Sequence, residues 1–299
     1  MTEEIQVCKK ATTYDEQIEI LRNRGCLISD ETFCKLKLQE INYYRFTAYF
    51  LPFRSEDGSY IEGTSFHTVY RIYEFDRKLR GILFSAIEEI EVFLRARFAY
   101  YFAHSYGPLG YLNSENFSSK HNKEKFERNL AREIENNKSV LFVKHHLENY
   151  DGKFPIWVIS ELFTFGMLSY FYNDMKTSDQ KNLASNIYGT TPKNLISWLR
   201  CCTDLRNICA HYGRLYYRIF SAVPAGFECR NAVLRRLWGA MLTLQHLYPS
   251  SQKWNSEILP RISALFDEYS GYINLYHVAF PDDWENQLKK KTDAHGECS

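Results

Sequence analysis

The chain of 299 residues is predicted to be an all-α protein, and two features of its sequence support that class. Apolar residues recur at steps of three and four along most of the chain, which is the spacing of one helix face. Alternation of apolar and polar residues, which is typical of a half-buried strand, is essentially absent. The apolar share of 45% and the charged share of 24% are those of an ordinary globular protein, so we expect a folded core.

The chain divides into an N-terminal helical part (residues 1–60), a main helical body (64–285) and a charged, frayed tail (286–299). An Asp-Gly turn within Ser55–Gly63 predicts a loop or a small hairpin between the first two. The predicted helices are Tyr14–Asn23, a second helix capped by Ser29 or Asp30 and ending at Leu38, Ser65–His104, Lys120–Asn137, Ile156–Asp174, Ser178–Tyr188, Lys193–Tyr212, Arg230–Leu247 and Ser256–Tyr269. We expect the three long ones within Val69–Tyr100, Ile156–Asp174 and Lys193–Tyr212 to pack as a bundle.

The longest predicted helix carries acids placed four residues before bases. Such pairs usually form a solvated, salt-bridged face, and this is the favoured interpretation; the alternative is that some of them support an active site or a partner helix. The pairs are Glu74–Lys78, Asp76–Arg80 and Glu91–Arg95.

The stretch LRCCTDLRNICAHYGRLYYR, Leu199–Arg218, gathers the groups best suited to chemistry. It reads as the end of a helix, with Gly213 as the residue that takes left-handed dihedrals just past it. His211 then lies in the final turn, where the partial negative charge of the helix end favours the imidazolium. Arg206 is a permanent cation that forks onto phosphate oxygens, and Asn207 lies beside it.

These residue types can cut RNA without a metal. Histidine can move a proton from a ribose 2′-hydroxyl or to a leaving 5′-oxygen, while arginine holds the charge on phosphorus. A five-residue step places Arg206 and His211 roughly 140° apart on a helix, so a second copy of the chain is expected to complete the site. The alternative is structural: a histidine and an arginine at a helix end often only satisfy carbonyls and complement the helix dipole.

The segment 200–236 is locally basic, with seven arginines against Asp204 and Glu228, although the whole chain carries only +1. We expect the following residues to bind RNA phosphates or to stack on bases: Arg200, Arg214, Arg218, Tyr212 and Tyr216. Glu161 is the only acid between Lys153 and Asp174; it either pairs with an arginine of the motif helix or lies at the surface.

The motif RNICAHYGRLYYR resembles the signature of the Abi-like (AbiD/AbiF) abortive-infection proteins of bacteria, whose Arg-x4-His element marks the HEPN superfamily. The blocks at Ile41–Arg54, Val69–Tyr100 and Phe154–Tyr172 are also similar to the family, in the family's order. The resemblance implies an all-helical fold, metal-independent RNA cleavage at a site completed by dimerisation, and a role in phage defence. Arg206 and His211 match the catalytic pair of that motif, and Asn207 matches its polar second position.

The predicted function is therefore a metal-independent endoribonuclease, an abortive-infection or toxin-type effector that works as a homodimer without a cofactor. The alternative is a non-catalytic RNA-binding module, or an interaction module regulated by a small RNA. A regulatory RNA or an antitoxin is a possible partner. Eight cysteines without a CxxC, a start that lacks an apolar core and the absence of a long apolar run favour a cytoplasmic protein without a metal or membrane segment.

Overall fold

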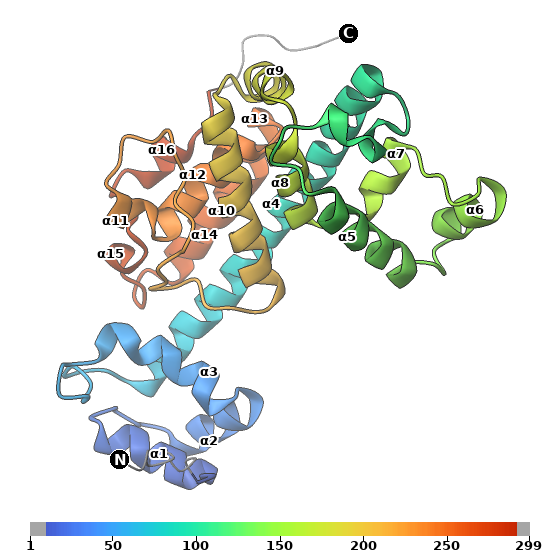
Figure 1. Ribbon diagram of the computed structural model, residues 1–299. Coiled ribbons are helices and arrows are strands. Elements are labelled where there is room, and N and C mark those ends of the chain that lie inside the picture. Colours follow the sequence, from blue (N-terminus) through green and yellow to red (C-terminus); the bar gives the residue numbers. More distant parts are fainter. Residues whose placement is uncertain (1–9, 292–299) are drawn as a thin grey trace, which may run out of the picture.

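The computed structural model describes residues 10–291, and Figure 1 shows its arrangement. The all-α prediction is confirmed: over 10–291 the chain forms helices and no β-strand, with three isolated β-bridges. No helix in this range is both long and apolar enough to span a bilayer.

The N-terminal part is a small group of helices at one end of the molecule (Figure 1). Its elements are α1 (Tyr14–Asn23), α2 (Glu31–Glu40), α3 (Tyr43–Thr47) and the 3-10 helix η1 (Ala48–Phe53). Thr13 and Glu16 form a capping box at the start of α1, and Asp30, one of the two predicted caps, begins α2. The predicted hairpin is limited to one antiparallel bridge between Arg54 and Tyr60.

Helix α4 (Phe66–Tyr106) connects the two parts of the molecule. Its 41 residues span about 60 Å, and its first turn belongs to the N-terminal core, where the Phe66 ring lies 6.3 Å from Phe33 and 4.8 Å from Phe46. Further along, α4 packs against the helices of the main body. The boundary expected near residue 60 therefore lies just before a helix that both parts share.

The middle of the chain forms an arm beside α4, followed by a helix of the central bundle. Its elements are η2 (Gly110–Leu112), η3 (Ser114–Asn116), α5 (Lys123–Asn136), α6 (Leu141–Asn149), α7 (Ile156–Ile159), η4 (Ser160–Leu162) and α8 (Phe165–Asp174). The single helix predicted over Ile156–Asp174 is wrong, because the chain turns between η4 and α8. Thr164 caps α8 by accepting the Met167 N–H (3.2 Å), and the Phe163 carbonyl accepts a bond from Arg95 (2.8 Å).

The remaining helices surround α10, which carries the motif. They are α9 (Thr177–Tyr188), α10 (Pro192–Ala210), α11 (Asn231–Leu234), α12 (Leu237–Leu247), α13 (Ser251–Lys253), the π-helical turn η5 (Trp254–Ile258), α14 (Leu259–Glu268), α15 (Leu275–Val278) and α16 (Trp284–Leu288). Helices α4, α8 and α10 pack against one another, as expected for the bundle. The helix predicted over Arg230–Leu247 is interrupted, because the Arg235 carbonyl instead accepts the Phe220 N–H at 2.7 Å.

The chain after α16 is held in place up to the last described residue. Leu288 is buried, the Gln245 amide donates to the Lys289 carbonyl, and Asn255 exchanges two hydrogen bonds with the Lys290 backbone. This differs from the frayed tail expected from residue 286 onward, because the charged side chains follow a buried leucine. Residues 292–299 of that tail lie outside the described range.

Candidate functional site

The motif helix ends three residues before its glycine. Helix α10 stops at Ala210 and His211 is its C-cap, while Tyr212 takes the left-handed conformation at φ 57°. The Tyr212 N–H bonds to the Cys209 carbonyl (3.2 Å) and the Gly213 N–H to that of Ile208 (2.7 Å), which together form a Schellman motif.

The assignment of the left-handed residue to Gly213 is therefore wrong. A Cβ on Gly213 would lie 3.0 Å from Ile208 Cγ2 and 3.2 Å from the Ile208 carbonyl, so the glycine permits close approach of the chain to the helix. A tyrosine in the left-handed region is strained, and it persists only where surrounding contacts enforce it.

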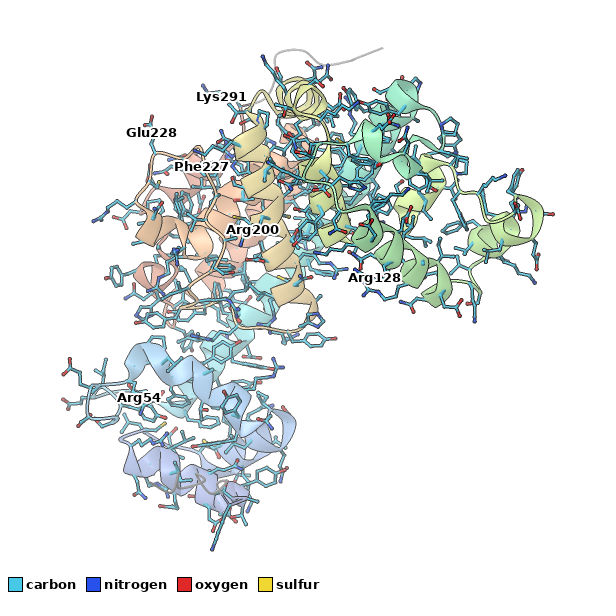
Figure 2. All side chains as sticks on the ribbon, in the orientation of Figure 1. Arg54, Arg128, Arg200, Phe227, Glu228 and Lys291 are labelled. Atoms are coloured by element: carbon cyan, nitrogen blue, oxygen red, sulfur yellow. The ribbon has the colours of Figure 1, made fainter. Side chains whose placement is uncertain are left out.

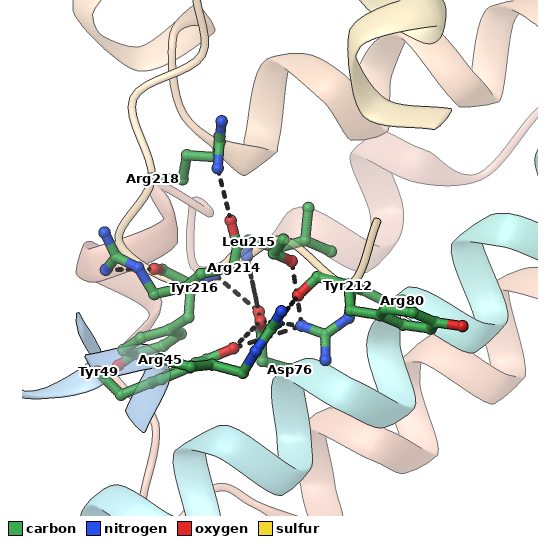
Figure 3. Close-up of polar contacts among 10 residues, drawn as sticks. Arg45, Tyr49, Asp76, Arg80, Tyr212, Arg214, Leu215, Tyr216 and Arg218 are labelled. Atoms are coloured by element: carbon green, nitrogen blue, oxygen red, sulfur yellow. Dashed lines mark hydrogen bonds and ion pairs between the residues drawn. The ribbon is translucent and has the colours of Figure 1, made fainter. Parts of the chain in front are cut away.

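Those contacts come from a buried carboxylate on α4, shown in Figure 3. Asp76 accepts the backbone N–H groups of Leu215 (3.1 Å) and Tyr216 (2.7 Å). It also accepts the Tyr49 hydroxyl (2.7 Å) and the Arg80 guanidinium (2.5 Å). The segment that follows the motif is thus fixed to α4 by two backbone N–H groups that donate to the Asp76 carboxylate.

Two arginines hold the carbonyls of the same segment (Figure 3). Arg80 donates to the Gly213 carbonyl at 3.1 Å, and Arg45 of α3 donates to the Tyr212 carbonyl at 2.5 Å. Arg45 belongs to the N-terminal part of the chain. The exit of the motif helix is therefore positioned jointly by α4 and by the N-terminal helices.

The sequence predicted that the acids placed four residues before bases on α4 form a solvated face. This prediction is wrong for Asp76–Arg80. The two side chains are 0% and 7% exposed. Burial raises the pKa of Asp76, and this is opposed by the charge of Arg80 and by the bonds from Tyr49, Leu215 and Tyr216. Since every one of those donors favours the carboxylate, we treat the pair as charged and as part of the fold.

Arg206 lies in a groove of about 270 Å³ between α10 and α4. Its Nε lies 3.9 Å from Glu91 Oε2, and it has no hydrogen-bond partner among the described residues. Glu91 also accepts Arg95 at 2.5 Å. One carboxylate of α4 is thus shared by two arginines, and Arg206 retains unused donors at the edge of the groove.

His211 and Asn207 are exposed on the far side of the helix end. Within the described range, 10–291, neither side chain forms a hydrogen bond or an ion pair with another group. No such contact joins His211 to Arg206 either. The structure therefore places an unengaged imidazole and an unengaged amide at the surface, with Arg206 turned toward α4. One chain presents the predicted catalytic set as separate parts.

Glu161 is not the partner of the motif helix. Its side chain is 55% exposed and lies 3.8 Å from Arg95, so of the two predicted environments the structure has the surface one. Glu91 occupies the role considered for Glu161. The signal for Glu91 was present in the sequence, as an acid four residues before an arginine, but exposed and buried pairs share that spacing.

Three arginines gather beyond the helix end. Arg214 donates to the Tyr216 carbonyl (2.9 Å) and Arg218 to the Arg214 carbonyl (3.3 Å). Burial lowers the pKa of Arg214, and so do the charges of Arg218 and Arg236. No described acid forms an ion pair with any of the three, and such a cluster favours an anion. Arg236 was not predicted as a binding residue; its guanidinium lies over the Tyr217 ring at 4.9 Å.

The other predicted RNA contacts differ in exposure. Arg200 is exposed on α10 (Figure 2), and the Tyr212 side chain is 70% exposed. Tyr216 is fully buried, accepts the Asn274 N–H and contacts His277, so its ring offers no face to a base. The expectation of stacking on Tyr216 fails because Asp76 draws its backbone into the core. Between residues 10 and 291, no three His, Cys, Asp or Glu side chains gather as a metal site requires.

Comparison with known proteins gives one match. The family model of the Abi-like protein matches residues 36–217, a range that covers more than half of the chain and includes α4, the arm and the motif segment as far as Tyr217. A search of curated proteins and a search of solved structures each return no match. The matched range contains Asp76 with its hydrogen-bond partners and the Arg206–His211 pair. On the basis of this match the chain belongs to the Abi-like protein family.

Proposed function

We propose that this protein is a metal-independent endoribonuclease of the HEPN type, related to AbiD and AbiF, that acts in the cytoplasm as an abortive-infection effector. The observation that carries the proposal is the exposed, unengaged His211 at the end of α10, next to a helix surface that bears Arg206. Membership in the Abi-like family supports the role in phage defence.

His211 would move the proton and Arg206 would hold the phosphate. In the cleavage step the 2′-oxygen attacks phosphorus, its proton leaves to a base, and the 5′-oxygen departs with a proton from an acid. The products are a 2′,3′-cyclic phosphate and a 5′-hydroxyl. Asn207, which lies four residues before His211 and so about one helical turn away, can orient either the imidazole or the scissile group.

The separation of these groups on one chain supports a homodimer. The groove beside Arg206 is lined by Phe84 and Val92, which are 39% and 58% exposed. Apolar side chains beside an unused guanidinium suit the approach of a second motif helix about a two-fold axis. Each cleft would then receive two arginines and two histidines.

Phosphates of the substrate would lie on the basic segment after the helix. Arg214, Arg218 and Arg236 supply a cluster of positive charge with which no acid among residues 10–291 forms an ion pair, and Tyr212 supplies an exposed ring nearby in the sequence. Rings of this kind bind unstacked bases, so single-stranded RNA is the expected substrate form.

The experiment is an assay of single-stranded RNA cleavage with and without EDTA. Wild-type protein should cut in both conditions, and His211→Ala should lose a factor of roughly 10²–10⁴ in rate, the span of a proton-transfer group. Arg206→Lys should also fail, because an ammonium cannot reproduce the bidentate fork. His145→Ala, which removes an exposed histidine on α6, is the matched control and should keep full activity.

Two outcomes would reject the mechanism: cleavage that stops with EDTA, or a full rate in His211→Ala. RNA binding without any cleavage by the wild type would instead favour the non-catalytic module regulated by RNA. A strictly monomeric protein with full activity would reject the shared site. Cleavage of DNA at a similar rate would exclude attack by the 2′-hydroxyl.

A further inference from the structure

A cavity of about 700 Å³ lies at the opposite end of α10 from His211. Segments from α4, the ends of α9 and α12, the start of α13 and the chain after α16 form its walls. Gly189 lines it and comes just before α10, whose 19 residues rise about 1.5 Å each. The cavity is therefore about 28 Å from the end of α10 that carries His211 and is separate from that end.

Among residues 10–291, the lining of the cavity includes three lysines and no acid. Lys289, Lys290 and Lys291 all contribute to its wall, whereas the chain as a whole carries only +1. The Lys290 ammonium donates to the Tyr248 carbonyl at 2.7 Å, which fixes this part of the wall. Figure 2 shows Lys291 near the start of α10.

A buried amide holds the lysine segment in position. The Gln245 side chain is 7% exposed, and its Nε2 donates to the carbonyls of Gln287 (3.1 Å) and Lys289 (3.4 Å). The cationic wall is thus attached to α12 through Gln245.

Two aromatic rings also line the cavity. Phe93 of α4 and Tyr188 of α9 have their ring centroids 6.4 Å apart and their planes at 76°. Flat rings and ammonium groups in one cavity match a ligand that has a planar apolar part and a negatively charged part. The volume lies within the range of about 300–1,000 Å³ that is common for small-molecule sites.

We propose that this cavity binds a nucleotide, with its phosphates on Lys289 and Lys291 and its base against Tyr188 and Phe93. Lysine binds phosphate as a point charge, and an aromatic wall accepts any base without reading its edge. The nucleotide is either free or the terminal residue of an RNA strand, and the experiment below separates the two sources.

Binding of three probes to the full chain tests the site: ATP, inorganic tripolyphosphate and a five-residue oligoadenylate, each titrated by calorimetry. Saturable binding of ATP identifies a free nucleotide, and binding of the oligonucleotide alone identifies a strand end. Lys289→Glu combined with Lys291→Glu should weaken whichever binds by at least about tenfold, since two charge reversals face the phosphates.

The control is Lys138→Glu combined with Lys144→Glu, which changes the net charge equally on the exposed arm and should bind as the wild type does. Both lysines of the test variant are exposed, so its melting temperature should match that of the control.

Three results would overturn the assignment. The first is that neither ATP nor the oligonucleotide binds. The second is that the double variant of Lys289 and Lys291 binds as well as its control. The third is that tripolyphosphate binds as tightly as ATP, which would leave the aromatic rings without a role. His211→Ala should retain binding, so failure of the ribonuclease proposal and failure of this site give different results.

Discussion

Two acid–arginine pairs on α4, each four residues apart, lie in opposite surroundings. Asp76 and Arg80 are enclosed, and both of them bond to the backbone of the segment after the motif helix. Glu91 and Arg95 line a groove, and Glu91 also faces Arg206 across 3.9 Å. The same spacing therefore produces a rigid anchor at one end of the motif and an adjustable contact further along.

If the proposed function holds, this difference separates residues that serve stability from residues that serve cleavage along one helix. A buried charge with four donors cannot move without loss of the fold, since removal of one partner leaves the other uncompensated. A carboxylate shared by two half-exposed arginines can exchange one partner for a phosphate. Substitutions in the first pair should therefore change stability, and substitutions in the second should change function.

The largest effect is expected from Asp76→Asn. The substitution leaves Arg80 buried without a counter-charge and weakens the bonds to Leu215 and Tyr216, so the free energy of unfolding should fall by about 3–5 kcal/mol. Guanidinium unfolding followed by circular dichroism measures this loss.

Asp15→Asn is the matched control, because Asp15 is 64% exposed and pairs with Lys35 at the surface. It should unfold at the wild-type midpoint. If the two variants unfolded alike, Asp76 would not anchor the motif segment.

Much of this fold is evident from sequence, because helix signals are local. The apolar spacing of Ile18 and Leu21, and the three- and four-residue spacing of Ile72, Phe75 and Leu79, predicted α1 and α4 correctly. The breaks at Thr164 and near Arg235 were missed, because they depend on Arg95 and Phe220, which are distant in the sequence.

The site was predictable by residue type but not by surroundings. Arg206, Asn207 and His211 stand out as a group, and the motif end lies close to its expected position. Whether an acid four residues before an arginine is buried depends on what packs over it, and here Tyr49 and the backbone of Leu215 do so. No local signal carries that information.

Glu91→Gln tests the second pair. The substitution removes the charge that attracts Arg206, so the proposed RNA cleavage should slow by about 10–100-fold through misplacement of the guanidinium. The free energy of unfolding should fall by about 1–2 kcal/mol, since glutamine keeps one bond to Arg95. Cleavage rates measured at saturating RNA, together with guanidinium unfolding, separate the two effects.

Glu161→Gln is the control for that variant. It removes an acid of the same type that also lies near Arg95. Glu161 is 55% exposed, however, and no ion pair between described residues joins it to Arg206. Rate and stability should both remain at the wild-type level. A loss of stability in Glu91→Gln as large as that in Asp76→Asn would erase the distinction between the pairs.

Arg45→Ala tests how far the N-terminal part extends the rigid anchor. Arg45 is exposed and donates one hydrogen bond to the Tyr212 carbonyl, so the cost should be about 1 kcal/mol. The more specific readout is hydrogen exchange, which should speed up at the amides of residues 213–216. Arg24→Ala removes another exposed arginine of the N-terminal part and should leave exchange there unchanged.

The smallest effect concerns His277, which contacts the anchored segment through Tyr216. The Tyr216 hydroxyl accepts the Asn274 N–H and shares a hydrogen bond with His277 Nδ1 at 2.8 Å. Burial lowers the pKa of His277, and the charge of Arg236 lowers it further.

Above about pH 6.5 the histidine is neutral in both the folded and the unfolded chain, so it adds no pH dependence. As the pH falls below that value the unfolded chain takes up the proton first, and stability declines until the pH passes the lowered folded pKa. The loss should be small, because His277 is half-exposed and solvent screens the charges.

Unfolding midpoints of wild type and His277→Gln between pH 7.5 and 5 measure this loss. The midpoint of the wild type should fall more steeply with acid than that of the variant. Parallel curves would show that the contact with Tyr216 does not depend on the neutral ring, and would limit the rigid anchor to Asp76 and its donors.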